Sequence, residues 1–158
     1  MKTILFIFLF VPVVLTGQSL VIFTKHSSFT TVKHYYERQC KSHKKNCGIT
    51  SKDDTLKIQI PGKDSFTMNF LFDPILHRCV FQEIIFSCNN CIDKHIKDLL
   101  NLKLYKWKKI SENKYLSNYY KQTEMHIKTD KVSERCLIIQ FYLINKPRKE
   151  YIKYYKLL

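Results

Sequence analysis

Glycine and proline are scarce in this chain of 158 residues, with three and four copies respectively. Collagen-like and low-complexity chains contain far more of both, and no run of glycine, proline or serine marks a flexible linker. No internal repeat and no shift of composition is visible along the sequence. These absences predict one folded domain rather than an array of units or two domains.

The chain also lacks the motifs of enzymatic and metal chemistry. Nucleophilic catalysis needs a Ser or Cys beside a base, and secreted ribonucleases carry short motifs around their catalytic residues, but neither pattern is present. Cys88-Asn-Asn-Cys91 has the spacing of a redox or zinc motif, but it has no βαβ setting and no second cysteine pair at matching spacing. The histidines are scattered and lie in no catalytic context: His26, His34, His43, His77, His95 and His126. We therefore expect no enzymatic activity, no metal and no other cofactor.

The chain begins with a continuous apolar stretch. Lys2 precedes an unbroken apolar stretch from Ile4 to Leu15, and the residues Thr16-Gly17-Gln18-Ser19 follow. This pattern is typical of a cleaved signal peptide, and the run is shorter than the ~20 residues that span a bilayer. We predict a signal peptide over residues 1–17, a secreted mature domain over residues 18–158, and no transmembrane span. A buried amino-terminal strand and an uncleaved anchor are the alternatives.

Cysteine and positive charge mark the rest of the chain. Six cysteines follow the predicted signal peptide, and an even number in an oxidising compartment predicts three disulfides, without fixing their pairing. Lysine and arginine number 27 against 13 acidic residues, for a formal net charge of +14. This excess favours anionic partners, namely lipid headgroups, acidic glycans or an acidic protein face; outside the cell, nucleic acid is not expected. A lysine-rich surface that only keeps the protein soluble is the alternative.

Alternating apolar residues predict strands. Leu56–Ile60 and Phe66–Phe72 alternate on either side of a Pro-Gly turn, which indicates a β-hairpin with one apolar face. Further strands are predicted over 79–86, 123–127 and 136–144, the last apolar on both faces as in a sheet centre. Residues 92–100 fit a helical stripe and 102–107 fit a strand, so we predict a short helical or irregular segment followed by a strand. Six to eight short strands indicate an all-β antiparallel sandwich or barrel.

Four local patterns are similar to those of a known family. They are Asn46-Cys47 with Leu56-x-Ile58-x-Ile60-Pro61 and Met68-Asn69-Phe70-x-Phe72; Cys79 with Cys88; Lys109-Ile-Ser-Glu-Asn-Lys-Tyr115; and Cys136-Leu-Ile-Ile-Gln-Phe-Tyr-Leu-Ile144. Together they resemble the ML lipid-recognition family, and within it a lipopolysaccharide co-receptor branch. The resemblance is spread over about two thirds of the predicted mature chain. A sterol-carrier branch fits less well, because a neutral sterol needs no such positive charge.

The resemblance implies an immunoglobulin-like antiparallel β-sandwich with disulfides, splayed as a cup that holds acyl chains. It implies the pairing Cys79–Cys88. For the other four cysteines we predict Cys40–Cys136, which would tie the start of the domain to the last strand, and Cys47–Cys91 is left by elimination. The implied lipid-binding residues are Leu56, Ile58, Met68, Phe70, Phe72, Tyr105, Ile110, Tyr115, Ile139 and Phe141. The implied basic rim, which would meet lipid phosphates, consists of Lys103, Lys106, Lys108, Lys109 and Lys114.

The expected function is then a secreted accessory protein that presents an acylated bacterial glycolipid to the extracellular domain of a Toll-like receptor. The alternative is a secreted, basic, cytokine-like or effector protein that binds acidic glycans or a receptor and has a filled core. Its suggestive feature is the tail over 146–156, which mixes basic and aromatic residues. An apolar cavity of several hundred cubic ångströms would favour the first function, and a packed core would favour the second.

Overall fold

The computed structural model describes residues 27–62, 65–75, 77–87, 91–118, 123–129 and 136–143. The predicted signal peptide and the basic tail over 146–156 lie outside these residues. The side chains of 136–143 also lie outside the described part, although the backbone of this strand is placed.

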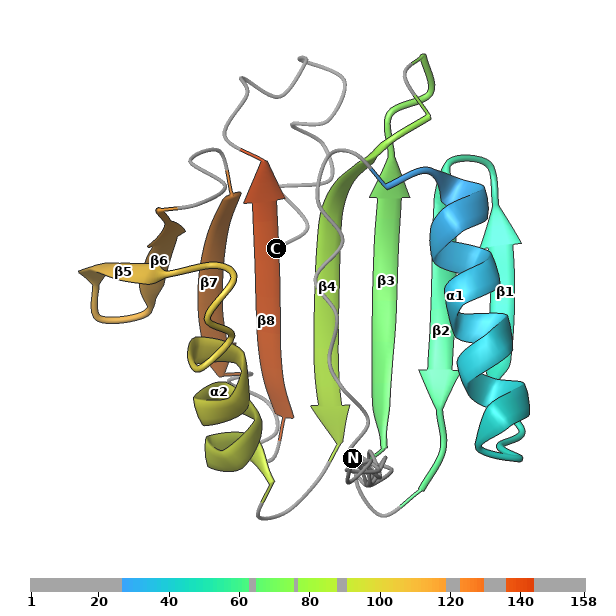
Figure 1. The fold of residues 1–158 in the computed structure, drawn as a ribbon, viewed down its shortest axis with the longest axis horizontal. Helices are drawn as coiled ribbons and strands as arrows, with labels where there is room; N and C mark the ends of the chain where they lie inside the picture. Colours follow the sequence, from blue (N-terminus) through green and yellow to red (C-terminus); the bar gives the residue numbers. More distant parts are fainter. Residues whose placement is uncertain are drawn as a thin grey trace, which may run out of the picture.

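Eight antiparallel strands form one hydrogen-bonded sheet in the order β1-β2-β3-β4-β8-β7-β6-β5 (Figure 1). The described residues also form the helices α1 (Phe29–Ser42) and α2 (Ile92–Leu100). The strands are β1 (Gly48–Lys52), β2 (Thr55–Ile60), β3 (Phe66–Phe72), β4 (Cys79–Ser87), β5 (Trp107–Ser111), β6 (Lys114–Ser117), β7 (Thr123–Thr129) and β8 (Cys136–Leu143). The prediction of a mostly β, antiparallel fold with a disulfide is confirmed.

The chain passes twice through the same order of elements. Helix α1 precedes the meander β1–β4, and helix α2 precedes β5–β8. The two halves meet where β4 pairs with β8, from Phe81 opposite Tyr142 to Ser87 opposite Cys136. The repeat exists in the order of elements and not in the residues, so the sequence did not reveal it.

The strand order gives the arrangement of the predicted antiparallel strands in detail. The two halves lie edge to edge, and Figure 1 shows α1 and α2 on the same face of the sheet, α1 in front of β2 and α2 toward β7. On that face Phe70 contacts Tyr36 of α1, and Phe86 stacks on His95 of α2. The apolar core therefore lies between one face of the sheet and the helices, rather than between two facing sheets.

The predicted hairpin is confirmed in its register. Ile58 pairs with Met68 and Leu56 pairs with Phe70, so the apolar residues of both strands share the helix-covered face. The opposite face carries polar residues, where Asn69 Nδ2 donates a hydrogen bond of 2.6 Å to Glu83 Oε2. Period-two alternation located these strands because each has one buried face.

Helix α1 was not predicted. Its buried residues Val32, Tyr36 and Cys40 recur every four positions, but the β-branched start Thr30-Thr31-Val32 hides this stripe. Ser28 begins the helix as an N-cap, and its side chain accepts a hydrogen bond from Thr31 N.

The predicted helical segment over 92–100 is confirmed as α2, whereas the strand expected from residue 102 begins only at Trp107.

The predicted disulfide pairing is wrong. Cys40, in the last turn of α1, is bonded to Cys47, with their Cα atoms 6.0 Å apart. An extended chain would hold cysteines seven residues apart at about 23 Å, but the end of α1 turns the chain back toward β1. The Cys40–Cys136 and Cys47–Cys91 bonds are therefore excluded.

Cys79 is a free, buried thiol, which excludes the Cys79–Cys88 bond and a total of three disulfides. Its Sγ lies 3.4 Å from the Phe81 carbonyl oxygen, to which it donates. Cys91 is also disulfide-bonded. Cys88 and the side chain of Cys136 lie outside the described part.

Candidate binding surface

The predicted lipid-binding residues of β2 and β3 lie together under α1. None of their side chains is more than 1 % exposed: Leu56, Ile58, Met68, Phe70 and Phe72. Tyr36 of α1 donates its hydroxyl to Met68 Sδ at 3.0 Å, and its ring lies 5.9 Å from that of Phe70. The ring of Phe29 meets Phe72 edge-on at 5.2 Å. Side chains of α1 therefore pack directly on the face that the cup hypothesis assigned to acyl chains.

The other predicted lipid-binding residues differ in how they relate to this cluster: Tyr105 belongs to the same buried core, and Tyr115 packs against that core. Tyr105 is buried at the end of the α2–β5 loop, Tyr115 of β6 is half-buried, and Ile110 is 50 % exposed. Ile139 and Phe141 are register partners of Ile84 and Gln82, and their side chains lie outside the described part. Of the predicted lipid-binding residues whose side chains the structure describes, Ile110 is therefore the one that lies outside the core.

Four of the five predicted rim lysines do gather at one edge of the molecule. Lys103 and Lys106 lie in the α2–β5 loop, Lys108 and Lys109 lie on β5, and all four side chains are exposed. Strand β5 is the last strand of the sheet and lies at the left in Figure 1. We call these four lysines the basic edge. The segment from Asn101 to Ser111 contains them and no acidic residue.

The fifth lysine is engaged elsewhere. Lys114 of β6 is partly buried, and its Nζ lies 2.8 Å from Glu124 Oε2 on β7. His126 Nε2 lies 2.9 Å from the same oxygen. Burial raises the pKa of Glu124, but the hydrogen bonds from Lys114 and His126 outweigh burial and leave that pKa below its ordinary value. Lys114 therefore pairs with the Glu124 carboxylate of the protein itself, whereas the other four predicted rim lysines are exposed.

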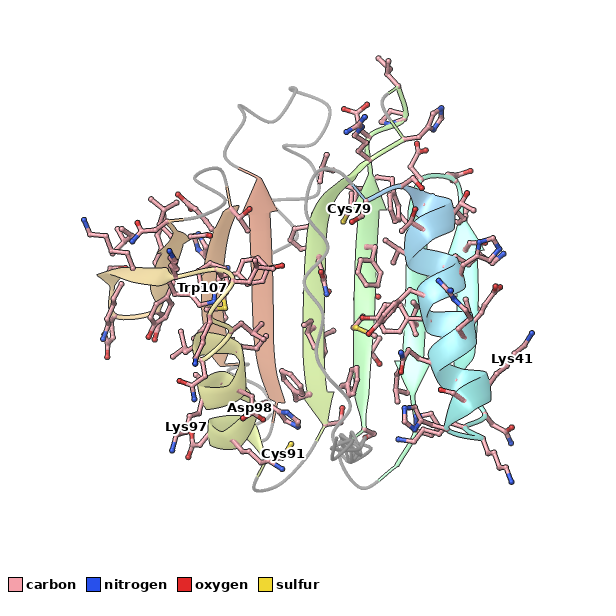
Figure 2. All side chains as sticks on the ribbon, in the orientation of Figure 1. Lys41, Cys79, Cys91, Lys97, Asp98 and Trp107 are labelled. Carbon is pink, nitrogen blue, oxygen red and sulfur yellow. A yellow bond between two sulfur atoms is a disulfide. The ribbon has the colours of Figure 1, made fainter. Side chains whose placement is uncertain are left out.

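Two aromatic residues fix the shape of the basic edge. The rings of Tyr105 and Trp107 stack in parallel with their centroids 5.1 Å apart. The Trp107 indole donates a hydrogen bond of 3.0 Å to the Leu99 carbonyl at the end of α2, and Ser117 Oγ donates at 2.7 Å to the Tyr105 carbonyl. Figure 2 labels Trp107 where the loop enters β5, above α2. Tyr105 is buried and Trp107 half-buried, whereas Leu104 and Lys106 are exposed.

Lys106 adopts a backbone conformation that lysine seldom takes. Its φ is +45°, in the left-handed region where a side chain meets the following carbonyl. A non-glycine residue pays about 1 kcal/mol there, and glycine does not. Lysine at this position keeps a charge on the edge at the expense of local backbone energy.

Other features of the described residues offer no second chemical site. An open cleft of about 310 Å³ lies at one end of β1–β3, lined by neutral side chains including Asn46, Gln59 and Thr67. Over the described residues, no group of three or more His, Cys, Asp or Glu is placed to hold a metal ion. No helix among them is long and apolar enough to cross a membrane.

Comparison with known proteins leaves the family open. No family model, curated protein or solved structure matches the chain. The resemblance to the ML lipid-recognition family therefore stays a prediction. Leu104 and Trp107 lie in the segment that carries the basic edge, and the site predicted from the sequence omitted both of them. The signal for them was the presence of apolar residues among the lysines of 103–109.

Proposed function

We propose that this protein is a secreted, non-enzymatic binding protein whose basic edge binds an anionic partner. The observation that carries the proposal is the set of four exposed lysines on a braced segment without an acidic residue. A formal net charge of +14 supports attraction of such a partner from a distance. An acidic glycan or the acidic face of a receptor has the required charge.

The packing of α1 favours this function over the presentation of glycolipid to a Toll-like receptor. Lipid presentation needs Met68, Phe70 and Phe72 to border space for acyl chains. Tyr36 and Phe29 contact these side chains from α1. Lipid binding within the β2–β3 face remains the competing hypothesis, and it requires α1 to move away from the sheet.

Binding at the basic edge should depend strongly on salt. Lysine ammonium groups act as exposed point charges, and such attractions are screened over about 10 Å at moderate ionic strength. The stacked Tyr105 and Trp107 hold the backbone of the segment, so little backbone entropy is lost when a partner binds.

The test compares two variants that lose the same charge. The first replaces Lys103, Lys106, Lys108 and Lys109 by Gln, and the second replaces Arg38, Lys41, Lys44 and Lys45 near the end of α1. On immobilised heparin, a sulfated glycan, we expect the edge variant to elute at clearly lower salt than the α1 variant. Equal shifts would mean that net charge alone drives binding, and the basic edge would then not be the site.

A further inference from the structure

We propose that the anionic partner of the basic edge is the surface of a lipid bilayer, with Leu104 and Ile110 inserted among the headgroups. This inference rests on the proposed function and narrows it to one class of partner. It concerns the outer edge of the molecule, and it needs no cavity in the core.

Exposed aliphatic side chains are the first reason. The exposed large hydrophobic residues among those the structure describes are Ile75, Leu104 and Ile110, exposed by 63 %, 55 % and 50 %. Two of the three lie within the segment that carries the basic edge. A sulfated glycan or an acidic protein rim gains little from them, whereas the boundary between headgroups and acyl chains takes up apolar side chains.

Charge complementarity is the second reason. Anionic lipids give a membrane a negative surface potential that attracts clustered lysines, by about fivefold in affinity for each lysine near the surface. Lysine stems are apolar, so they can lie beside Leu104 and Ile110 while the ammonium groups stay at the level of the phosphates. The segment Asn101–Ser111 combines both kinds of side chain and contains no acidic residue; the exposed Glu112 follows it in the turn between β5 and β6.

The order of the backbone is the third reason. Trp107 is tied to the Leu99 carbonyl, and the Tyr105 carbonyl is tied to Ser117. Tyr105 and Trp107 are buried and half-buried, whereas Leu104 and Lys106 of the same loop are exposed. A segment already held in this form does not have to be ordered at the membrane.

A competing explanation is protection of the sheet edge. Among the described residues β5 pairs with β6 alone, and lysines on edge strands prevent pairing with another chain. This role needs the charges of Lys108 and Lys109 but gives Leu104 and Ile110 no purpose. The two explanations therefore differ in what the aliphatic residues do.

The experiment is flotation of the purified protein with vesicles of phosphatidylcholine alone and of an equimolar mixture with phosphatidylserine. We expect binding to the mixed vesicles only, weakened about tenfold or more in Leu104→Ser/Ile110→Ser and in Lys108→Gln/Lys109→Gln. Ile75→Ser and Lys41→Gln/Lys44→Gln are the matched controls, and they should bind as the parent does. Trp107, the only tryptophan of the chain, should change its emission when the parent binds.

Retained vesicle binding in Leu104→Ser/Ile110→Ser, or equal binding to both vesicles, would overturn the inference. If heparin binding depends on the basic edge and vesicle binding does not, the proposed function stands and a glycan or protein is the partner. If neither depends on it, both proposals fail. Aggregation of Lys108→Gln/Lys109→Gln together with unchanged vesicle binding of its soluble fraction would favour edge protection and count against the membrane.

Discussion

Lys44 and Lys106 have similar backbone conformations but different surroundings. Lys44 has φ +50° just after α1, where Lys44 N donates to Lys41 O and Lys45 N donates to Cys40 O. These two bonds form a Schellman motif, a position that glycine usually occupies. Lys106 has φ +45° within the basic edge.

The first prediction follows from this pair. Lys44→Gly and Lys106→Gly should each raise the free energy of unfolding, by about 0.5–1 kcal/mol, because both relieve left-handed backbone strain. Only Lys106→Gly should also weaken binding to the anionic partner. Urea denaturation and heparin elution measure the two effects. A loss of stability in Lys44→Gly would show that its side chain contributes more than the backbone costs.

The lowered pKa of Glu124 predicts that the free energy of unfolding depends on pH in the acidic range. Its pKa is lower in the folded protein than in the unfolded chain, because hydrogen bonds from Lys114 and His126 outweigh burial. The stabilisation is therefore complete above the unfolded pKa and is lost as pH falls through the lower folded pKa. Unfolding free energies measured below pH 5 should fall less steeply in Glu124→Gln than in the parent. Identical slopes would mean that the pair with Lys114 adds nothing to stability.

The free thiol of Cys79 allows a chemical test of which cysteines form disulfides. Burial raises the pKa of its thiol to about 12, so the native thiol should resist alkylation at neutral pH. In denaturant without reductant, alkylation should mark Cys79, and peptide mapping should find Cys40 joined to Cys47. Recovery of Cys79 in any disulfide would contradict the structure, and recovery of Cys79 joined to Cys88 would restore the pairing that the family resemblance implies.

At the scale of elements, the contact between α1 and β3 decides whether the core is filled. Phe70 is 1 % exposed and lies against Tyr36. Phe70→Ala should therefore leave a void and cost about 3–5 kcal/mol. Phe81→Ala, on the opposite face and only half-buried, should cost less. A neutral acylated ligand, which the lysines of the basic edge do not attract, should not raise the melting temperature of the parent; a clear increase would support the lipid cup.

The elements that could be predicted are those with one buried face. Leu56, Ile58, Met68 and Phe70 alternate with polar residues, and this pattern gave the hairpin and its inward face correctly. Helix α1 was missed because its stripe of Val32, Tyr36 and Cys40 is sparse and begins among β-branched residues. The same omission contributed to the wrong disulfides, since it is the end of α1 and the turn after it that bring Cys40 close to Cys47.

At the scale of the whole molecule, the arrangement depends on pairing between distant strands. No local pattern states that β4 pairs with β8, and this pair makes one sheet of the two halves. The cluster of lysines near residue 106 was visible in the sequence. Their location on the last strand, and the exposure of Leu104 and Ile110 beside them, required the structure.

The central claim is that the partner binds at the basic edge and not inside the fold. Hydrogen–deuterium exchange of the protein, free and saturated with mixed phosphatidylcholine–phosphatidylserine vesicles or heparin, tests it most directly. We predict slower exchange over 101–111 in the bound protein, with α1, β2 and β3 unchanged. Changes confined to α1, β2 and β3, with 101–111 unaffected, would contradict the claim and point to a ligand in the core.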